Sequence, residues 1–516
     1  MIVHQNTNHY QTNYHEYSSI PVFQYSNTTD ILFYINMPDL EVIIGLEVHA
    51  QMNTKTKMFC GCNNDAFGKA PNTTVCPICM GHPGTLPAPN AVAIEKAMKA
   101  SLALKCSINP DNHFDRKHYF YPDLPMGFQI SQFDFPLSSS GSVVYDLIDD
   151  AGKVTDTKTC GITRLHMEND AGKLTHRGST TLCDYNRAGT PLMEIVTEPD
   201  LRNEQEAVAF AQELRRILIA INASEADMFK GMMRFDASIS LREKGTEKLN
   251  PRSEIKNLNS FKALERALQY EEKRLRKEWE DNGGPRKGDI TVGWMDDVGK
   301  TRMLREKESA DDYRYFPEPD IPPLHFVQED IDAVASTLPK LPREQKEDYI
   351  QMGLDEKQAL QLVDQSALRV IFDAVHKKTQ DPKRTSSLVL TQLLGFLNAT
   401  EKEVTNGPDA TAILELIEKI DDGTISGNAG KDVLQKMVET GKSATAIIEE
   451  EGMQQISDDS SIEQLVQMAM NANPKAIEDF QSGNEKALGA IVGFVMKESK
   501  GQANPAKVNE ILKKKL

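Results

Sequence analysis

Four cysteines in two close pairs constrain the N-terminal part of the 516-residue chain more than any other feature. Cys60-Gly-Cys62 and Cys76-Pro-Ile-Cys79 are separated by thirteen residues. Two pairs of thiolates at this spacing can close a tetrahedral zinc site, and Gly61 permits a tight turn between ligands. Because every ligand position is a cysteine, no position is left open for a reactive water. We therefore expect a structural zinc site; free buried or surface thiols are the alternative.

The composition argues against a disulfide framework. The chain has seven cysteines, and an odd number in a long chain is not typical of a secreted disulfide-rich protein. Cys106, Cys160 and Cys183 have no partner at ligand spacing, so we expect them in the core. The net charge of −17 disfavours a uniformly basic nucleic-acid-binding surface and favours a cytoplasmic protein. No apolar run approaches the roughly 20 residues that span a bilayer.

Residues 1–36 differ from the rest of the chain. They contain five of the thirteen tyrosines and no lysine or arginine, and the first basic side chain is Lys55. A signal peptide or transit peptide needs basic residues, so neither fits. We expect a disordered tail, or translation begun upstream of a true start at Met37; an ordered arm is the alternative.

The remaining sequence predicts an α+β fold. Residues 40–52 alternate like a strand, and "RFDASISLRE" forms a second strand-like run. Asn90 and Asn203 precede helical patterns, and Glu206 completes a capping-box spacing with Asn203. After Pro323 helical patterns dominate, and "NGPD" (406–409) is typical of a linker. We expect a mixed domain with an antiparallel sheet over 37–325, a helical domain over 326–405 and a helical tail domain over 406–516.

Three short segments combine acidic, amide and imidazole side chains. Glu47 and His49 are two residues apart and so share one face of a strand. An ionised Glu194 inside the apolar run "PLMEIV" is costly unless it is paired or bound to a metal. Such side chains suit Mg²⁺, whose charge supports phosphoryl transfer. For each residue alone, a surface or salt-bridged carboxylate is the alternative. The other members of these segments are His166, Glu168, Asn169, Asp170, Asn186, Arg187, Glu198 and Asp200, and Asp236 interrupts a further strand.

The common nucleotide-binding loops are missing from the sequence. "DVGKT" resembles the end of a P-loop, but Trp294 occupies the position of its first glycine, and no G-x-G-x-x-G occurs. Any use of ATP therefore needs a site of another kind. The serine-rich "PLSSSGS" (136–142) lacks a lysine motif before it, so we interpret it as a polar turn.

Several long motifs resemble the B subunit of the tRNA-dependent amidotransferases, the GatB family. The resemblance runs from about Leu40 to Leu516, and its C-terminal part resembles the YqeY-like tail of that family. The motifs are "IGLEVHAQMNTKTKMFCGC", "FDRKHYFYPDLPMGFQISQ", "ITRLHMENDAGK", "DYNRAGTPLMEIVTEPD", "EIKNLNSF", "DDYRYFPEPDIPPL", "GNAGKDVLQKMVETG" and "MKESKGQANP".

The resemblance implies a reaction and a set of partners. The chain would form a heterotrimer with an amidase, the A subunit, and with a small third protein, the C subunit. It would use ATP and Mg²⁺ to phosphorylate the side-chain carboxylate of misacylated Glu-tRNA(Gln) or Asp-tRNA(Asn). Ammonia released from glutamine would then displace the phosphate and give the amide. This is the activity of a glutamine-hydrolysing carbon–nitrogen ligase.

The resemblance also implies roles for individual residues. Glu47, His49, Glu168 and Glu194 match catalytic and magnesium positions, and Asp236 matches a further magnesium position. Asn169 stands where many members have glutamate, so it could ligate only through its amide oxygen. Phe235, Ser238 and "TVGW" (291–294) depart from the family pattern and weaken the assignment around 230–295. Cys60, Cys62, Cys76 and Cys79, which we call the cysteine clip, match the zinc site of many members.

Lys513, Lys514 and Lys515 could contact tRNA phosphates, although a solvated helix end explains them as well.

Two rival interpretations of the whole chain follow from the residues. A zinc-stabilised RNA-binding scaffold without chemistry would have no use for costly carboxylates in its strands. A metallohydrolase would need an open catalytic metal, which four cysteine ligands do not provide.

Overall fold

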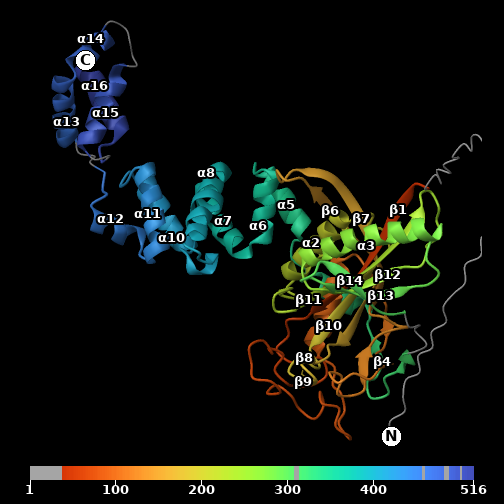
Figure 1. Cartoon of the computed structure of the whole chain (residues 1–516). Helices are drawn as coiled ribbons and strands as arrows, with labels where there is room; N and C mark the ends of the chain where they lie inside the picture. The colour runs from red at the N-terminus through yellow and green to blue at the C-terminus, as the bar shows by residue number, and fades with distance from the viewer. Residues whose placement is uncertain (1–37, 307–312, 456–458, 482–486, 500–501) are drawn as a thin grey trace, which may run out of the picture. The chain divides into compact units, whose positions relative to one another are not determined.

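A nine-stranded sheet forms the centre of the N-terminal domain (Figure 1). The computed structural model describes residues 38–306, 313–455, 459–481, 487–499 and 502–516, so our prediction for residues 1–36 lies outside the described residues. The strand order is β14-β13-β12-β11-β1-β10-β7-β6-β2, and neighbours are antiparallel except β12 and β13. The bounds are β1 Leu40–Gln51, β2 Ser107–Ile108, β6 Ser138–Ile148, β7 Val154–Asn169, β10 Pro191–Thr197, β11 Met233–Glu243, β12 Ser253–Leu258, β13 Ile290–Met295 and β14 Lys300–Glu306.

Strand β1 lies in the middle of this sheet, between β10 and β11. Its apolar residues Leu46, Val48 and Ala50 are at most 1% exposed, whereas Glu47 and His49 between them are half-buried. Because alternate side chains of a strand point to opposite faces, one face of β1 is apolar and the other carries the polar residues. The strand predicted over 40–52 is confirmed.

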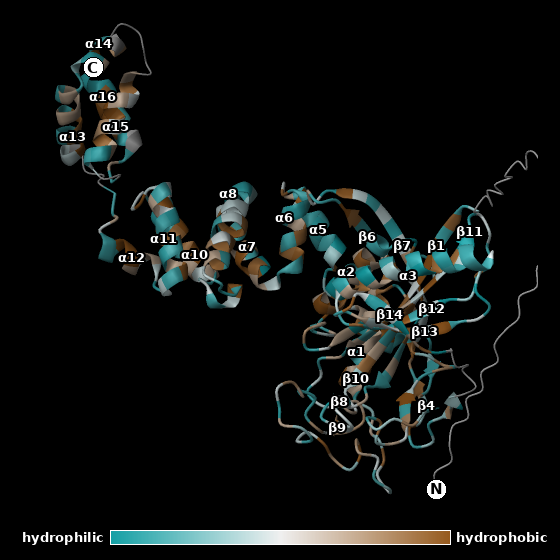
Figure 2. Cartoon of the chain, viewed as in Figure 1, coloured by the Kyte–Doolittle hydropathy of each residue, from teal (hydrophilic) through white to brown (hydrophobic). Residues whose placement is uncertain are grey.

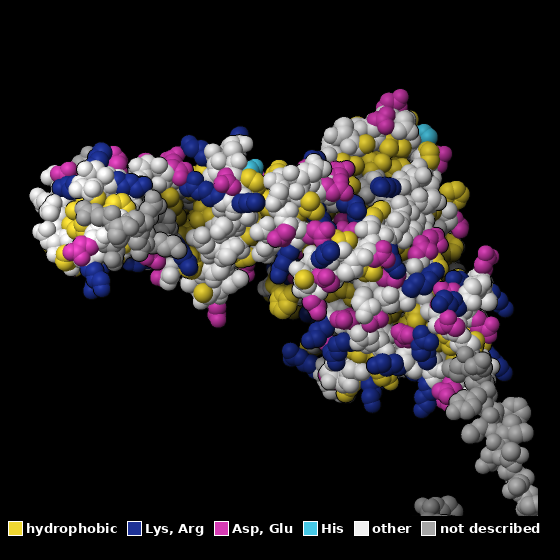
Figure 3. Space-filling view, turned by 90° about the horizontal axis from the view of Figure 1, so that it is seen from above, with side chains coloured by type: hydrophobic (Ala, Val, Ile, Leu, Met, Phe, Trp, Pro, Cys, Tyr) yellow, Lys and Arg dark blue, Asp and Glu magenta, His cyan; other side chains and the backbone are white. Residues whose placement is uncertain are grey.

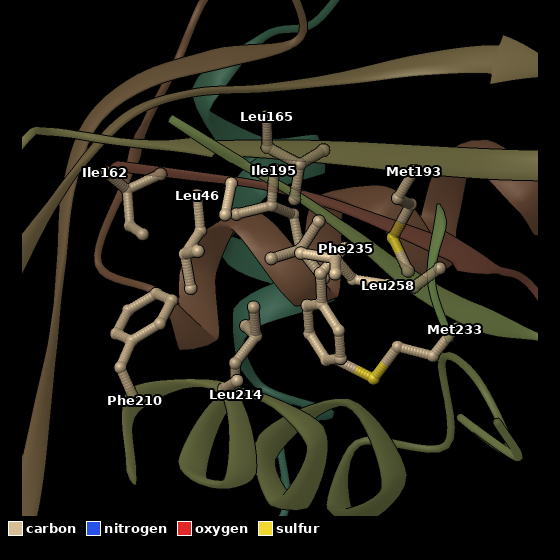
Figure 4. Close-up of a cluster of buried hydrophobic side chains, with 14 of the residues drawn as sticks. Leu46, Ile162, Leu165, Met193, Ile195, Phe210, Leu214, Met233, Phe235 and Leu258 are labelled. Atoms are coloured by element: carbon tan, nitrogen blue, oxygen red, sulfur yellow. The ribbon is translucent and has the colours of Figure 1, made fainter. Parts of the chain in front are cut away.

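Helices α2 (Glu204–Ala220) and α3 (Phe261–Asn282) pack against the apolar face of the sheet. Figure 4 shows Phe210 and Leu214 of α2 pointing toward Leu46, Ile162 and Phe235 of the strands. Figure 2 shows that much of α3 is hydrophilic, as expected for a helix with one face in solvent. Burial of this apolar interface stabilises the domain and leaves the opposite face of the sheet free for polar groups.

Side chains cap the helices where the sequence predicted helix starts. Asn90 Oδ1 accepts from Val92 N at 3.0 Å at the start of α1 (Ala91–Ala103). Asn203 Oδ1 accepts from Glu206 N at 2.8 Å at the start of α2. The Glu206 carboxylate does not complete the predicted capping box, because it accepts from Arg202 N at 2.9 Å instead of from the backbone of Asn203.

Short strands form smaller sheets beside the polar face. β4 (Asp115–His118) pairs with β5 (Phe128–Ser131) and with β15 (Phe316–Pro317), and β5 contacts β7. The remaining short pairs are β3 (Asp111–Asn112) with β16 (Leu324–His325) and β8 (Lys173–Arg177) with β9 (Thr180–Asp184). This arrangement brings Lys117 of β4 and Tyr315, just before β15, near Glu168 and Glu194 of β7 and β10.

Helices follow β16 to the C-terminus, which confirms the expected α+β fold with a helical C-terminal part. One apolar cluster contains Leu362, Phe372 and Leu397 together with Leu416 and Val433. This core therefore continues across residues 406–409, where we expected one domain to end. A separate cluster contains Ile462, Ile491, Val508 and Leu512.

The described helical elements after the sheet domain are α4 Gln328–Ala335, α5 Pro342–Gln351, α6 Glu356–Asp364, α7 Ser366–Thr379, α8 Pro382–Ser386, η2 Ser387–Leu393, α9 Leu394–Ala399, η3 Val404–Asn406, α10 Ala410–Asp421, α11 Gly427–Thr440, α12 Ala444–Glu451, α13 Asp459–Ala472, α14 Pro474–Gln481, α15 Leu488–Glu498 and α16 Pro505–Lys515. Within the described part of the chain, no helix is both long and apolar enough to cross a membrane.

Candidate active site

The register of three central strands brings His49, Glu194 and His166 together on the polar face of the sheet. His49 of β1 is paired with Glu194 of β10, and Glu194 is paired with His166 of β7. Directly opposed residues of antiparallel strands have side chains on the same face. Glu168, two residues after His166, therefore also lies on this face.

Glu194 is the centre of a cluster of three buried side chains and the half-buried His49, which we call the imidazole cluster (His49, His166, Glu168 and Glu194). Its Oε2 lies 3.2 Å from His49 Nε2 and 3.4 Å from His166 Nε2. Glu168 Oε2 lies 3.9 Å from His166 Nε2 and accepts from Ser131 Oγ at 3.3 Å. His166, which the family pattern did not single out, is thus in direct contact with the predicted residues.

The electrostatics of the imidazole cluster favour an ionised Glu194. Burial opposes ionisation, but the two imidazoles hold the pKa of Glu194 well below its usual range. Burial also lowers the pKa of His49, yet hydrogen bonding to Glu194 makes the net shift upward. The Nδ1 atoms of His49 and His166 are buried and have no hydrogen-bond partner within the described structure.

A second group lies beside it, formed by Glu47, Asp236 and Glu254, which we call the carboxylate cluster. Glu47 is paired with Asp236 across β1 and β11. Lys256 Nζ lies 2.8 Å from Asp236 Oδ2 and 2.7 Å from Glu254 Oε1. Burial and the neighbouring carboxylates of Glu194, Glu254 and Asp236 raise the pKa of Glu47.

Both clusters offer suitable ligands for divalent cations. In His49, Glu168 and Glu194, one potential ligand atom per residue lies within 4.8 Å of the others, and the same holds for Glu47, Asp236 and Glu254. Carboxylate oxygens, alone or with an imidazole, are a donor set that Mg²⁺ accepts. Three neighbouring carboxylates with one lysine also leave excess negative charge, which a cation would offset.

A half-buried cation, Lys117, flanks the imidazole cluster. Lys117 of β4 has its Nζ 5.0 Å from the ring centroid of Tyr313. Burial alone would lower the pKa of Lys117, but Tyr315, Glu168 and Glu194 raise it above its usual range. Lys117 therefore stays charged beside the site and could attract an anionic group.

Several predicted polar residues support the surrounding backbone instead. Asn169 Oδ1 accepts from Ile130 N at 2.8 Å, so its amide oxygen already has a partner, and its role as a ligand stays a prediction. Asp170 forms ion pairs with Arg234 at 3.2 Å and Arg187 at 3.6 Å. Burial opposes ionisation of Asp170, but the two arginines hold the pKa of its carboxylate well below the usual range.

The other predicted polar residues lie outside the clusters. Asn186 Oδ1 accepts from the backbone of Thr73 at 2.7 Å and so supports the loop of the cysteine clip. Glu198 is exposed and accepts from Thr163 Oγ1 at 2.8 Å, and Asp200 accepts from Gly161 N at 2.9 Å. These contacts give Asn186, Glu198 and Asp200 structural roles.

A cavity of about 400 Å³ adjoins the carboxylate cluster. Glu47 belongs to both, and Gly45, Ser238 and Ser240 continue the cavity wall along β1 and β11. Its other lining residues are Ile43, Leu46, Thr163, Val196, Thr197, Pro199, Leu249, Asn250, Arg252 and Asp289. Mixed apolar, hydroxyl and amide groups of this kind are typical of a small-molecule pocket.

The four sulfur atoms of Cys60, Cys62, Cys76 and Cys79 all lie within 4.8 Å of one another, so the predicted clip residues come together. Hydrogen bonds, first from Cys60, lower the pKa of Cys79 to about 5, whereas burial raises that of Cys62 to about 11. This sulfur cluster fits a tetrahedral thiolate site.

The three remaining cysteines lie away from the clip. Cys106 and Cys160 are buried, as expected, and Cys183 is half-buried on β9. Burial raises the pKa of Cys106 to about 11 and that of Cys160 to about 12, which keeps both thiols protonated.

Comparison with known proteins assigns the family. Residues 42–332 match the model described as the GatB/GatE catalytic domain, and residues 370–516 match the model described as the GatB domain. The chain belongs to the GatB family. The first match contains the sheet, both clusters and the cysteine clip. The candidate site therefore lies within the matched catalytic domain.

Curated GatB relatives resemble nearly the whole chain. A protein of Persephonella marina is 45% identical over 486 residues, which cover 93% of this chain and 100% of the relative. Proteins of Brevibacillus brevis and Thermotoga maritima are each 43% identical and cover 93% and 92% of this chain, and 99% and 98% of their own lengths. Each of the three is named as the B subunit of an aspartyl/glutamyl-tRNA(Asn/Gln) amidotransferase.

Sequence reasoning missed some GatB residues that reach the clusters. Glu254 and Lys256 alternate with buried Ile255 on β12, so the same strand pattern that revealed Glu47 could have revealed them. Arg234 precedes Asp236 by two residues on β11 and shares its face. Lys117 gave no comparable signal, because it reaches the site from a short strand of another sheet.

Proposed function

We propose that this chain activates the side-chain carboxylate of a misacylated aminoacyl-tRNA for amidation. Its GatB relatives are amidotransferase subunits named for aspartyl-tRNA(Asn) and glutamyl-tRNA(Gln). Membership in the family makes the chain a subunit of a ligase that acts in protein biosynthesis. Asn-tRNA(Asn) and Gln-tRNA(Gln) are the products.

The activation step has a simple chemical basis. One oxygen of the substrate carboxylate attacks the γ-phosphorus of ATP, and ADP leaves with the electrons of the broken P–O bond. Ammonia then attacks the acyl carbon of the acyl phosphate, inorganic phosphate leaves, and a proton is lost from nitrogen. A carboxylate is a poor acyl donor, whereas the phosphate of an acyl phosphate leaves readily.

The proximity of the two clusters carries this proposal. His49, Glu168 and Glu194 would hold one Mg²⁺, and Glu47, Asp236 and Glu254 would hold another. Bound Mg²⁺ offsets the negative charge of ATP and of the substrate carboxylate. Glu194 fixes the two imidazoles from between them, at 3.2 and 3.4 Å, and Lys117 adds positive charge near Glu168.

The cavity beside Glu47 is the best-supported place for the nucleoside of ATP. Its volume of about 400 Å³ suits a ligand of that size, and its apolar residues could contact a base. Ser238 and Ser240 offer hydroxyl groups toward a ribose. A nucleoside in this cavity would direct its phosphates toward the carboxylate cluster, to which Glu47 also belongs.

Membership in the family supports a proposed assembly and location for the chain. An amidase (the A subunit) and a small third protein (the C subunit) would complete a heterotrimer, and the amidase would supply ammonia from glutamine. Acidic and basic side chains are interspersed on the face seen in Figure 3, which fits tRNA binding by local contacts more than by a continuous basic surface. We further propose a cytoplasmic location.

Two parts of the proposal lie away from the active site. The cysteine clip would hold a structural zinc ion. Lys513, Lys514 and Lys515 lie in the last turn of α16 and are exposed, so they could contact tRNA phosphates. Lys514 also pairs with Glu510 at 2.7 Å, which reduces its charge toward a phosphate.

Trapping of the acyl phosphate tests the proposed function. The chain, co-purified with its partner subunits, is incubated with misacylated Glu-tRNA(Gln), ATP, Mg²⁺ and hydroxylamine, without glutamine. The account predicts a γ-glutamyl hydroxamate on the tRNA that depends on ATP. Tight tRNA binding without any hydroxamate would contradict the proposal and favour the scaffold interpretation.

A further inference from the structure

Lys57 is a fully buried lysine beside the cysteine clip, with an exposed fraction of 0%. Its Nζ lies 3.8 Å from Cys79 Sγ and 3.5 Å from the carbonyl oxygen of Tyr185. Within the described residues, no carboxylate oxygen lies within 4.0 Å of this nitrogen. A buried ammonium group needs an anionic partner, and the thiolate of Cys79 is the partner that the geometry offers.

The negative charge of a metal site with four thiolates explains why a lysine beside it would be stabilising. Four thiolates around one divalent cation carry a net charge of about −2, which is costly where the surroundings exclude water. Cys60 and Cys79 are buried, and Cys62 and Cys76 are half-buried. One ammonium group at Cys79 would halve that net charge and orient the sulfur toward the metal.

Lys57 also joins the clip to the chain segment that leads into β10. Lys57 N donates to Cys62 O at 3.0 Å, and the next residue, Met58, donates to Gly189 O at 2.8 Å. Gly189 has a φ of +88°, and a Cβ there would lie 3.4 Å from both Lys57 Cδ and Cys79 Cβ. The turn thus packs directly on the Lys57–Cys79 pair, five residues before Glu194.

We propose that Lys57 is a positioning residue for the clip. Its ammonium group pairs with the Cys79 thiolate, helps the clip to retain a d¹⁰ cation such as Zn²⁺, and holds the Tyr185–Thr190 turn in place. This inference rests on the metal-holding clip of the proposed function. Lys57 acts through Cys79 and the turn and does not contact the reacting groups. Loss of its charge should weaken metal binding even though all four sulfur ligands remain.

Metal retention tests the proposal directly. Lys57→Met replaces the ammonium group with an apolar side chain of similar length, and Lys55→Met is a matched control at an exposed lysine two residues away. Zinc content is measured in the complex with its partner subunits, followed by transfer of zinc to a colorimetric chelator. We expect about tenfold or greater weakening in Lys57→Met and no change in Lys55→Met. Equal retention in both variants would overturn the proposal.

A double-mutant cycle in the same complex separates charge pairing from packing. Lys57→Met is compared in two backgrounds, the wild type and Cys79→Ser, with the melting temperature as readout. Pairing with the thiolate predicts a lower melting temperature in the wild-type background. It predicts no loss or an increase in the Cys79→Ser background, where the ammonium group has lost its anion. The same decrease in both backgrounds would show a packing role and overturn the proposal.

The two measurements also distinguish this proposal from the proposed function. Absence of zinc from the wild-type complex would overturn the structural zinc site itself, and the Lys57 proposal with it. Zinc in the wild type that Lys57→Met retains unchanged would overturn only the role of Lys57. In either case the hydroxylamine experiment still tests the amidation chemistry independently.

Discussion

His49 Nε2 lies 3.2 Å from Glu194 Oε2, although the two residues are 145 positions apart in the chain. The antiparallel pairing of β1 with β10 places them directly opposite each other. Helices α2 and α3 do not cover this face of the sheet. The two side chains can therefore contact a ligand instead of packing in the apolar core. The relationship ties the proposed chemistry to the strand register.

Replacement of Glu194 tests the imidazole cluster. Glu194→Gln keeps the shape of the side chain but removes the negative charge between His49 and His166. We expect at least about a 100-fold loss of amidation, because the charge that orients both imidazoles and would bind Mg²⁺ is gone. The control is Glu198→Gln, at an exposed carboxylate just beyond β10. Unchanged amidation in Glu194→Gln would remove this residue from the site.

The carboxylate cluster predicts a specific change in magnesium dependence. Glu254→Gln removes one of three clustered carboxylates and leaves Asp236 to pair with Lys256 at 2.8 Å. We expect the Mg²⁺ concentration that gives half-maximal ATP cleavage to rise about tenfold or more. Glu243→Gln, at the exposed end of β11, should leave it unchanged. An equal magnesium requirement in both variants would contradict a cation at this cluster.

The core beneath the site predicts a large loss of stability. Phe235 is 0% exposed and precedes Asp236 on β11, with its ring 5.7 Å from that of Phe261. Phe235→Ala should lower the free energy of unfolding by about 3–5 kcal/mol, because it removes buried apolar area and leaves a cavity. Urea denaturation followed by circular dichroism measures this change. Phe67→Ala, at a ring that is 54% exposed, should cost much less.

An ion pair between β6 and α5 predicts a pH-dependent contribution to stability. Asp146 Oδ2 lies 2.8 Å from Lys346 Nζ, and Asp146 Oδ1 lies 3.1 Å from Arg343 Nη1. Burial raises the pKa of Asp146, but the pairs with Lys346 and Arg343 make the net shift downward. A lowered folded-state pKa stabilises the fold above the unfolded value of about 3.9, and this contribution is lost as the pH falls through the folded pKa.

Thermal unfolding of Asp146→Asn measures that contribution. The wild type should exceed the variant in stability by a constant amount above about pH 5, and the difference should shrink as the pH is lowered further. Asp150→Asn, at an exposed carboxylate in the turn after β6, is the control and should show little difference at any pH. A wild-type advantage that grows toward low pH would contradict the assigned direction of the shift.

Local sequence patterns predicted much of the fold and part of the site. The alternation around Glu47 and His49 predicted both a strand and its polar face, and Glu194 was noticeable because a carboxylate interrupted an apolar run. Strand order was not predictable from the same patterns, because pairing of β10 between β1 and β7 depends on contacts distant in the sequence. The same limitation left His166 as one of several polar candidates, because its contact with Glu194 depends on the pairing of β7 with β10.

Two further differences also depend on contacts between separate parts of the chain. The "NGPD" segment has the composition of a linker, yet Leu397 before it and Leu416 after it share one apolar cluster. Lys57 resembled any lysine in a polar loop, because its burial depends on Tyr185 and Gly189 more than 120 residues later. Sequence patterns reveal which face of an element is apolar, but not which distant turn covers it.

ATP hydrolysis by the chain, co-purified with its amidase partner in Mg²⁺, tests the central claim most directly. The rate is measured without tRNA, with uncharged tRNA(Gln) and with misacylated Glu-tRNA(Gln). The account predicts stimulation by the misacylated tRNA alone, because only that tRNA presents a carboxylate to phosphorylate. Tight binding of misacylated tRNA without stimulated hydrolysis would contradict it, and would leave the clustered carboxylates without the chemistry proposed for them.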